Sequence, residues 1–176
     1  MNIREAAAAD IPALHALIES AYRGESAKAG WTHEADLLGG QRTDPEALAA
    51  IIADPAQAIL LAETQDGIVG CVLIADKGLR AGDRIGYLGM LTVRPDLQST
   101  GMGRRLIVAA EQRAREFGAV IMEMTVISVR QELIDWYVRR GYADTGLTEP
   151  FPVHDPRFGV PKAPGLIFRV LGRRLD

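Results

Sequence analysis

The sequence predicts an α+β fold with a mixed, mostly antiparallel sheet, and three observations predict it. The hydrophobic pattern changes period along the chain: two helical segments come first, three strand-like segments follow, and helices and strands then alternate. The Q-D-G sequence at 65–67 is typical of a tight turn, so residues 58–64 and 68–75 should form an antiparallel hairpin. Residues 1–176 contain no repeat or linker and are enough for one domain with a sizeable core.

Two helices are expected before the hairpin. The first covers residues 11–22, with Asp10 as its N-cap and apolar residues recurring on one face. The second covers residues 46–53 and opens with a capping box formed by Thr43 and Glu46. The polar segment between the two helices is expected to be loop and short helix.

The remaining elements follow from apolar runs and glycine. We expect strands at residues 84–93, 119–128, 142–146 and 166–171, a loop at 78–83, and helices at 101–117 and 131–140. Gly89 within the third strand indicates a bulge or a close backbone approach. About four helices would therefore flank the sheet. An exposed edge strand such as 166–171 could pair between chains, so a homodimer is an open alternative.

Composition excludes several classes of function. The formal net charge is −3, whereas nucleic-acid binding needs a concentrated basic face, so no nucleic-acid partner is expected. No apolar segment approaches 18 residues and no signal-peptide pattern begins the chain, which predicts a cytoplasmic protein without a membrane partner. Cys71 is the one cysteine, and the three histidines are far apart, so no metal site is expected.

The stretch VRPDLQSTGMGRRL, residues 93–106, joins a predicted strand to a predicted helix. Gly101 and Gly103 allow a ligand to approach the backbone, and the helix that follows offers unpaired N–H groups and the positive end of its dipole. Such a turn suits a phosphate or pyrophosphate. The glycine spacing matches neither a dinucleotide fold nor a P-loop, and a plain turn is the alternative.

Two motifs carry a resemblance to a known family. Gln98, Gly101 and Gly103 match the pattern [Q/R]-x-x-G-x-[G/A], which resembles the acetyl-CoA-binding signature of the GNAT superfamily of N-acetyltransferases. The later WYVRRGY, residues 136–142, is similar to the segment in which these enzymes often carry a tyrosine. The predicted order of elements also agrees with that fold.

The resemblance implies how acetyl-CoA would bind. Strands 84–93 and 119–128 would splay apart to admit the pantetheine arm, and backbone N–H groups after the first strand would hold the pyrophosphate. The residues expected to contact the cofactor are Leu91, Thr92, Val93, Gln98, Ser99, Thr100, Gly101, Met102, Gly103, Arg104 and Ser128. Ser128 lies near the position where many relatives carry an asparagine, so its contact is an open point.

The resemblance also implies catalytic roles. Tyr137 would protonate the departing coenzyme A thiolate, although it could instead pack on an apolar helix face. The backbone N–H of Leu91 is the candidate donor to the oxyanion. For the general base, Glu123, Glu34, Tyr87 and a water chain are all alternatives.

Two loops, residues 20–40 and 145–165, would build the acceptor pocket in such a fold. The residues expected to contact the acceptor are Trp31, Glu34, Tyr87 and Phe151, because aromatic groups beside carboxylates suit a small cationic amine. The aromatic residues could equally anchor the loops. The expected function is transfer of an acetyl group from acetyl-CoA to the primary amine of a small molecule, by direct attack in a ternary complex. A protein N-terminal or lysine acetyltransferase and a non-catalytic acyl-CoA sensor are the alternatives.

Overall fold

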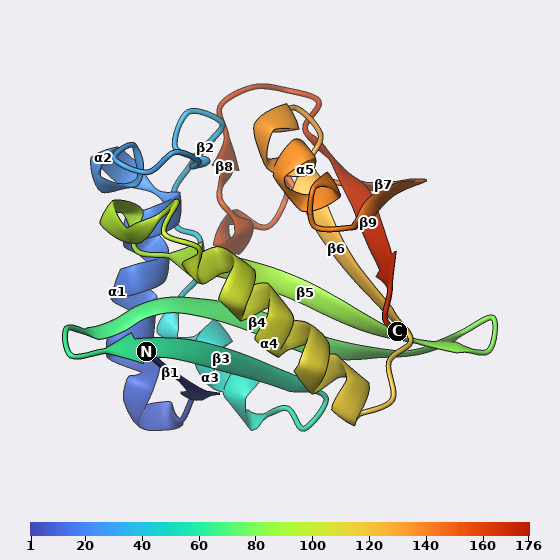
Figure 1. The fold of residues 1–176 in the computed structure, drawn as a ribbon. Coiled ribbons are helices and arrows are strands. Elements are labelled where there is room, and N and C mark those ends of the chain that lie inside the picture. The colour runs from blue at the N-terminus through green and yellow to red at the C-terminus, as the bar shows by residue number, and fades with distance from the viewer.

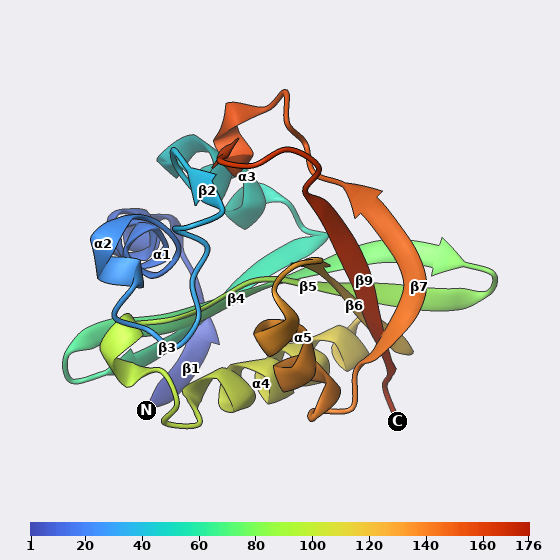
Figure 2. The same ribbon diagram turned by 90° about the horizontal axis from the view of Figure 1, so that it is seen from above.

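The computed structural model describes residues 1–176, which form a seven-stranded sheet with helices on both faces (Figures 1 and 2). The helices are α1 (Ile11–Tyr22), α2 (Gly24–Ala27), α3 (Pro45–Ala53), α4 (Met102–Glu116) and α5 (Gln131–Val138). The strands are β1 (Asn2–Glu5), β2 (Leu38–Gly39), β3 (Gln57–Thr64), β4 (Gly67–Arg80), β5 (Asp83–Val93), β6 (Ile121–Ile127), β7 (Ala143–Pro150), β8 (Val160–Pro161) and β9 (Ile167–Arg174).

The main sheet has the order β1-β3-β4-β5-β6-β9-β7, and β2 and β8 form a separate two-stranded sheet. Every neighbouring pair in the main sheet is antiparallel except β5 and β6, which are parallel. The predicted mixed, mostly antiparallel α+β fold is therefore confirmed. None of the five helices combines the length and the apolar character that a membrane span needs.

Two apolar cores lie on opposite faces of the sheet. Successive strand residues point to opposite faces, so Ile59 and Leu61 pack with α1 and α3, whereas Leu60 and Ala62 belong to the core under α4 and α5. Figure 2 shows α4 and α5 on one side of the sheet and α1, α2 and α3 on the other. The sheet is thus covered on both faces, and its strands read as apolar runs.

The sheet opens between β5 and β6, as predicted. Only Ile85–Tyr87 of β5 pairs with Ile121–Glu123 of β6, and beyond Tyr87 the two strands diverge (Figure 1). Near this opening β5 contains a bulge, because Met90 and Leu91 have no partner residue in β4. Met90 takes a positive φ of 49°, so the bulge lies next to Gly89, which itself pairs with Leu73. A Cβ at Gly89 would come within 2.8 Å of the Tyr87 ring, so the close neighbour there is a side chain rather than the backbone that we predicted.

The helix caps differ from the predictions. Asp10 is the N-cap residue of α1, as predicted, but its carboxylate makes no capping bond and accepts hydrogen bonds from the Arg4 guanidinium and the Ala7 N–H instead. The cap of α3 is Asp44 rather than Thr43, with Asp44 Oδ1 2.7 Å from Ala47 N. The arginine that bonds Asp10 lies on strand β1, a strand that the sequence did not predict.

Two further predictions, on the edge strand and on the loop at 78–83, also need correction. Residues 166–171 do not form an exposed edge, because β9 lies between β6 and β7, and the edges are β1 and β7. The more apolar strand is the inner one: β9 buries Val170 and Leu171, whereas every residue of β7 is exposed. The expected loop at 78–83 shrinks to a two-residue turn, so β4 and β5 form a long projecting hairpin (Figure 1).

Candidate active site

Two cavities meet where β5 and β6 diverge. The first, which we call the α4 cleft, has a volume of about 500 Å³ and lies between the N-terminus of α4, β5 and α5. The second, which we call the β6 cavity, has a volume of about 390 Å³ and lies against β5, β6 and the loops after β7. Both cavities are bordered by Tyr22, Leu91, Arg130, Leu133 and Tyr137. These five residues therefore form a shared wall, at which two ligands could meet.

The α4 cleft contains most of the predicted cofactor residues. It is lined by Leu91, Thr92, Val93, Gln98, Ser99, Gly101, Gly103 and Arg104. Gly101 is the N-cap of α4 with a φ of 88°, and no side chain bonds the first N–H groups of this fifteen-residue helix. The open helix start and the two glycines suit a pyrophosphate, so the residues present fit the phosphate end of acetyl-CoA.

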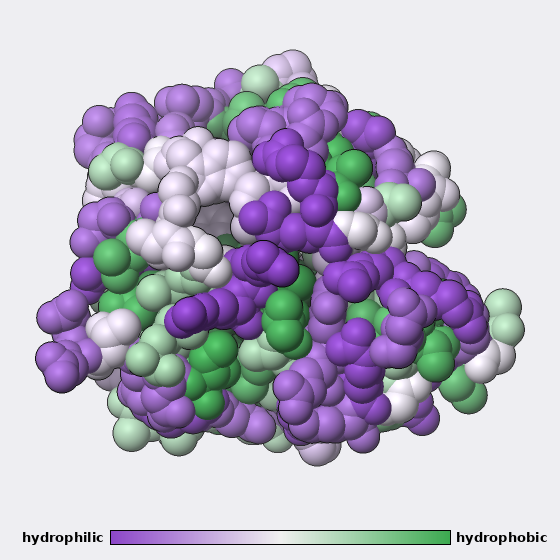
Figure 3. All heavy atoms as spheres, in the orientation of Figure 1, coloured by the Kyte–Doolittle hydropathy of each residue, from purple (hydrophilic) through white to green (hydrophobic).

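Basic side chains complete the rim of the α4 cleft. Arg104, Arg139 and Arg140 all line it, and the Arg140 guanidinium lies 3.4 Å from the centre of the Trp136 ring. Burial and then the neighbouring Arg139 lower the pKa of Arg140. Figure 3 shows a hollow on this face, with strongly hydrophilic side chains beside it. An anionic ligand would relieve the repulsion among these cations.

Three predicted cofactor residues lie outside the α4 cleft. Met102 points into the core, and Thr100 donates its hydroxyl to the Leu97 carbonyl. Ser128 lines neither cavity, and its backbone N–H bonds the Ile167 carbonyl. The side chain of Gln98 lies against the loop that contains Thr32, whose N–H is 3.4 Å from its oxygen.

Tyr137, the predicted proton donor, lies on the shared wall between the two cavities. It lies on α5, borders both cavities and is only 6% exposed. Its ring packs edge-on against Trp136 and Tyr142. Burial raises the pKa of Tyr137 well above its ordinary value, so the phenol keeps its proton at neutral pH and can donate it.

Leu91 lies in the bulge of β5, on the shared wall. Its carbonyl accepts a hydrogen bond of 2.8 Å from the hydroxyl of Tyr22, which fastens the end of α1 to the bulge. Burial raises the pKa of Tyr22 to about 12, so this hydroxyl stays a donor. Leu91 has no partner residue in β4, and β6 has already diverged at this point, so Leu91 borders the opening of the sheet.

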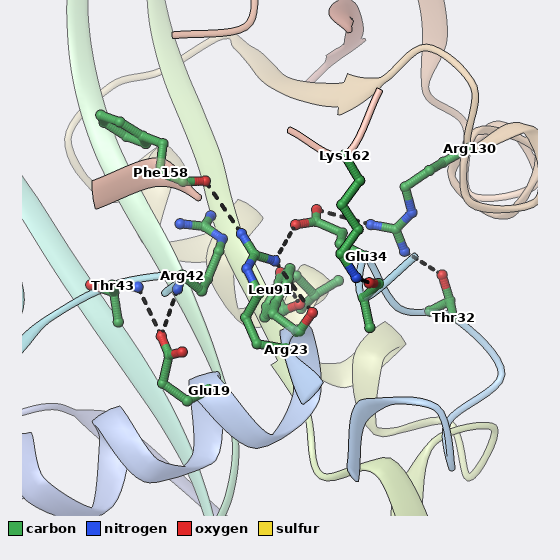
Figure 4. A network of polar contacts seen from close by, with 12 residues as sticks. Glu19, Arg23, Thr32, Glu34, Arg42, Thr43, Leu91, Arg130, Phe158 and Lys162 are labelled. Atoms are coloured by element: carbon green, nitrogen blue, oxygen red, sulfur yellow. Dashed lines mark hydrogen bonds and ion pairs between the residues drawn. The ribbon is translucent and has the colours of Figure 1, made fainter. Parts of the chain in front are cut away.

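Glu34 is held between two arginines. Its Oε2 is 2.9 Å from Arg23 Nη1 and its Oε1 is 3.1 Å from Arg130 Nη1, as Figure 4 shows. All three side chains are nearly buried. Both oxygens of Glu34 are thus engaged, and the sequence offered no signal for Arg23 and Arg130 because they lie far apart along the chain.

The other two candidates for the base lie differently. Glu123 lines neither cavity and forms an ion pair with Arg80, although in the sheet it is paired with Tyr87, the last pair before β5 and β6 diverge. Tyr87 lines the β6 cavity, where its hydroxyl lies 2.9 Å from Thr125 Oγ1 across the gap between the strands.

The remaining predicted acceptor residues do not gather in one place. Trp31 lines the α4 cleft, with its ring 6.3 Å from that of Trp136. Phe151 lines neither cavity and is buried in a small apolar cluster with Leu38, Ile127 and Leu166. The structure therefore brings only Glu34 and Tyr87 of this set to the β6 cavity.

Comparison with known proteins agrees with this geometry. The family model of the acetyltransferase (GNAT) domain matches residues 22–151. The amino-acid acetyltransferase of Ralstonia nicotianae is 36% identical over 78 residues, which are 44% of this chain and 16% of that protein. The chain therefore spans well under two thirds of the length of this curated relative.

Solved structures show the same fold. The ribosomal-protein-alanine N-acetyltransferase of Brucella melitensis superimposes with a TM-score of 0.72 at 19% identity, covering 99% of this chain and 100% of that one. A Salmonella typhimurium protein solved with its cofactor acetyl-CoA gives a TM-score of 0.71 at 21% identity, and the match covers 100% of this chain and 94% of that one. Because the family model spans most of the chain, this protein belongs to the GNAT acetyltransferase family.

Proposed function

We propose that the protein transfers an acetyl group from acetyl-CoA to the primary amine of a small molecule, by direct attack in a ternary complex. The observation that carries this proposal is the shared wall: the α4 cleft and the β6 cavity meet at Tyr137 and Leu91. Two ligands bound in these cavities would approach each other at a buried tyrosine and at the bulge of β5.

On this proposal, the N–H groups of residues 98–104 hold the pyrophosphate, and Arg104 adds charge at the rim. When bound, acetyl-CoA supplies an acetyl group already activated as a thioester. The protein then has to position the amine, accept its proton, and supply hydrogen bonds where negative charge develops.

Two groups on the shared wall suit these tasks. In this proposal the backbone N–H of Leu91, in the β5 bulge, donates a hydrogen bond to the negative charge that develops on the acetyl oxygen. As the bond from nitrogen to carbon forms and the bond from carbon to sulfur breaks, Tyr137 gives its proton to the thiolate. The amine proton leaves to the other side, by way of Tyr87 or water in the β6 cavity.

The closure of the β6 cavity favours a small acceptor. Strands β2 and β8 pair the loop after α2 with the loop before β9, the two segments predicted to build the acceptor pocket. Arg23 donates to the Phe158 carbonyl and Lys162 bonds the Ala35 carbonyl, so further contacts hold the loops together. An extended peptide needs an open groove, whereas these contacts bridge the two loops.

The test is acceptor-dependent release of the coenzyme A thiol from acetyl-CoA. We expect release with small primary amines and little with peptides that offer a free N-terminus or a lysine. Release with peptides alone would replace the proposal by a protein acetyltransferase. Tight binding of acetyl-CoA in calorimetry, without release in any acceptor mixture, would replace it by a sensor.

A further inference from the structure

One cation that lines the β6 cavity, Arg42, forms no ion pair with a carboxylate. Arg42 lines the cavity, and its guanidinium lies 5.0 Å from the centre of the Tyr22 ring. By contrast, the two other arginines near this cavity, Arg23 and Arg130, share the carboxylate of Glu34. The guanidinium of Arg42, unlike theirs, has no carboxylate within ion-pair distance.

Hydrogen bonds to the backbone fix the position of Arg42. One carboxylate oxygen of Glu19, on α1, accepts hydrogen bonds from Arg42 N at 2.7 Å and from Thr43 N at 2.9 Å (Figure 4). The side chain then lies over the Tyr22 ring. A charged group fixed before its ligand arrives loses less conformational entropy on binding, which favours a binding role.

The charges around the β6 cavity favour an anion. Two carboxylates line the cavity: Glu34 already forms ion pairs with two arginines, and Glu149 is exposed to solvent. Positive surroundings also favour the neutral form of an amine over its ammonium form, and the neutral form is the one that attacks. A ligand with an amine alone would leave Arg42 unbalanced.

We infer that the acceptor carries a carboxylate beside its primary amine, as a free amino acid does, and that Arg42 binds this carboxylate. This inference rests on the acetyl transfer proposed above. Tyr22 joins the two ends of the site: its ring lies under Arg42, and its hydroxyl is bonded to Leu91 on the shared wall. A guanidinium can pair with both oxygens of a carboxylate, which orients the amine as well as holding it.

The experiment uses matched acceptors: each of the common amino acids, its carboxamide, and the amine that lacks the carboxylate. We expect the wild-type protein to prefer the free amino acid by about tenfold or more in kcat/KM. Arg42→Gln should raise KM for that amino acid about tenfold or more, with a small change in kcat. The KM of the carboxamide and of acetyl-CoA should stay unchanged, and Arg42→Lys should restore part of the loss.

Arg113→Gln is the matched control, because Arg113 lies on α4, does not line the β6 cavity, and pairs with the exposed Glu116. Thermal unfolding checks that every variant is folded. Binding of the amino acids and carboxamides to the protein without acetyl-CoA, measured by calorimetry, gives a readout that needs no turnover. Carboxylate-dependent binding that Arg42→Gln abolishes would support the inference even if acetyl transfer failed.

Two results would overturn the inference while leaving acetyl transfer intact. One is equal use of amino acids, carboxamides and simple amines by the wild-type protein. The other is an equal rise in KM for all three kinds of acceptor in Arg42→Gln. Absence of thiol release from every acceptor would contradict the proposed function instead, and the calorimetry would then decide whether Arg42 binds a carboxylate.

Discussion

The α4 cleft and the β6 cavity lie on two sides of Tyr137, but the chain builds them in different ways. The α4 cleft takes many of its groups from the single stretch 91–104, and the N–H groups of its glycine turn come from the backbone. The β6 cavity takes side chains from α1, the loop before α3, β5, β6, β7 and the loop after β7. Its polar groups are mostly side chains, among them Arg42 and Tyr87.

This difference has a consequence for specificity. Backbone N–H groups are present whatever the side chain, so a site made from them tolerates substitution and suits a ligand shared by many proteins. A cavity made from side chains on distant segments changes its chemistry with each substitution. We therefore expect substitutions in the two regions to separate binding of acetyl-CoA from choice of acceptor.

The largest effect is expected on the wall between the regions. Tyr137→Phe should lower kcat about 100-fold, because the proton donor is lost, while the Kd of acetyl-CoA changes little. Tyr142→Phe is the matched control: this tyrosine is also buried, contacts Tyr137, and bonds Glu111 rather than facing a cavity. Steady-state kinetics that give the two variants the same kcat would remove Tyr137 from the chemistry.

The pH profile of the wild-type protein adds to this test. Burial raises the pKa of Tyr137, so the phenol stays protonated as the pH rises to about 10. The kcat/KM should therefore climb as the acceptor amine loses its proton, without a fall from loss of the acid. A decline in activity below pH 9 would contradict this assignment.

The next largest effect is expected on stability, for a substitution beside the β6 cavity. Glu34→Gln leaves the buried Arg23 without a negative partner and leaves Arg130 with only the half-exposed Glu132, 3.6 Å away, which should lower the free energy of unfolding by about 3 kcal/mol. Thermal unfolding should register a lower Tm. The control Glu116→Gln breaks an exposed pair with Arg113 and should cost less than about 1 kcal/mol. Unchanged stability with abolished kcat would instead make Glu34 the general base.

A third substitution tests the α4 cleft alone. Gly101 has a φ of 88° in open space, and Gly67 in the β3–β4 turn has a φ of 92°, also in open space. Alanine at either position should cost about 1 to 2 kcal/mol of stability through the same backbone strain. Only Gly101→Ala should raise the KM of acetyl-CoA, by about tenfold if the helix start shifts. A similar change in Gly67→Ala would show that lost stability, not the loop, is the cause.

The smallest effect is expected at the rim of the α4 cleft. Arg104→Ala should weaken binding of acetyl-CoA by about two- to fivefold, and less at high salt, because an exposed charge is well screened. Arg105→Ala is the control, since Arg105 is exposed but does not line the cleft. Calorimetry at two salt concentrations measures both, and equal losses would indicate a general effect of net charge.

Local features of the fold could be predicted, and long-range ones could not. Residues 11–22 form a helix as predicted and the turn at 65–67 closes a hairpin, because helical spacing and turn chemistry are local. Strand β1 was missed because its four residues carry little signal of their own, and it pairs with β3 far along the chain. Strand β9 is an inner strand because β7 pairs with its outer edge, and nothing in the residues of β9 indicates that pairing.

The same distinction holds for the site. The glycine turn at 98–104 follows from contiguous residues, and it lines the α4 cleft in large part. The contacts of Glu34 with Arg23 and Arg130 join three segments, and Arg42 reaches the β6 cavity through a bond to Glu19 on α1. Such groups become visible only when the chain is folded, because no spacing rule relates them.

The short pairing of β5 with β6 divides the sheet into two unequal sections. One holds β1, β3, β4 and β5, the other β6, β9 and β7, and only three residue pairs join them within the sheet. Each section can be regarded as a cooperative folding unit with its own resistance to amide exchange. A ligand bound along the open edges of β5 and β6 would hold the two units together. Hydrogen exchange of the backbone amides at their junction should then slow, which would report ligand binding without any catalytic turnover.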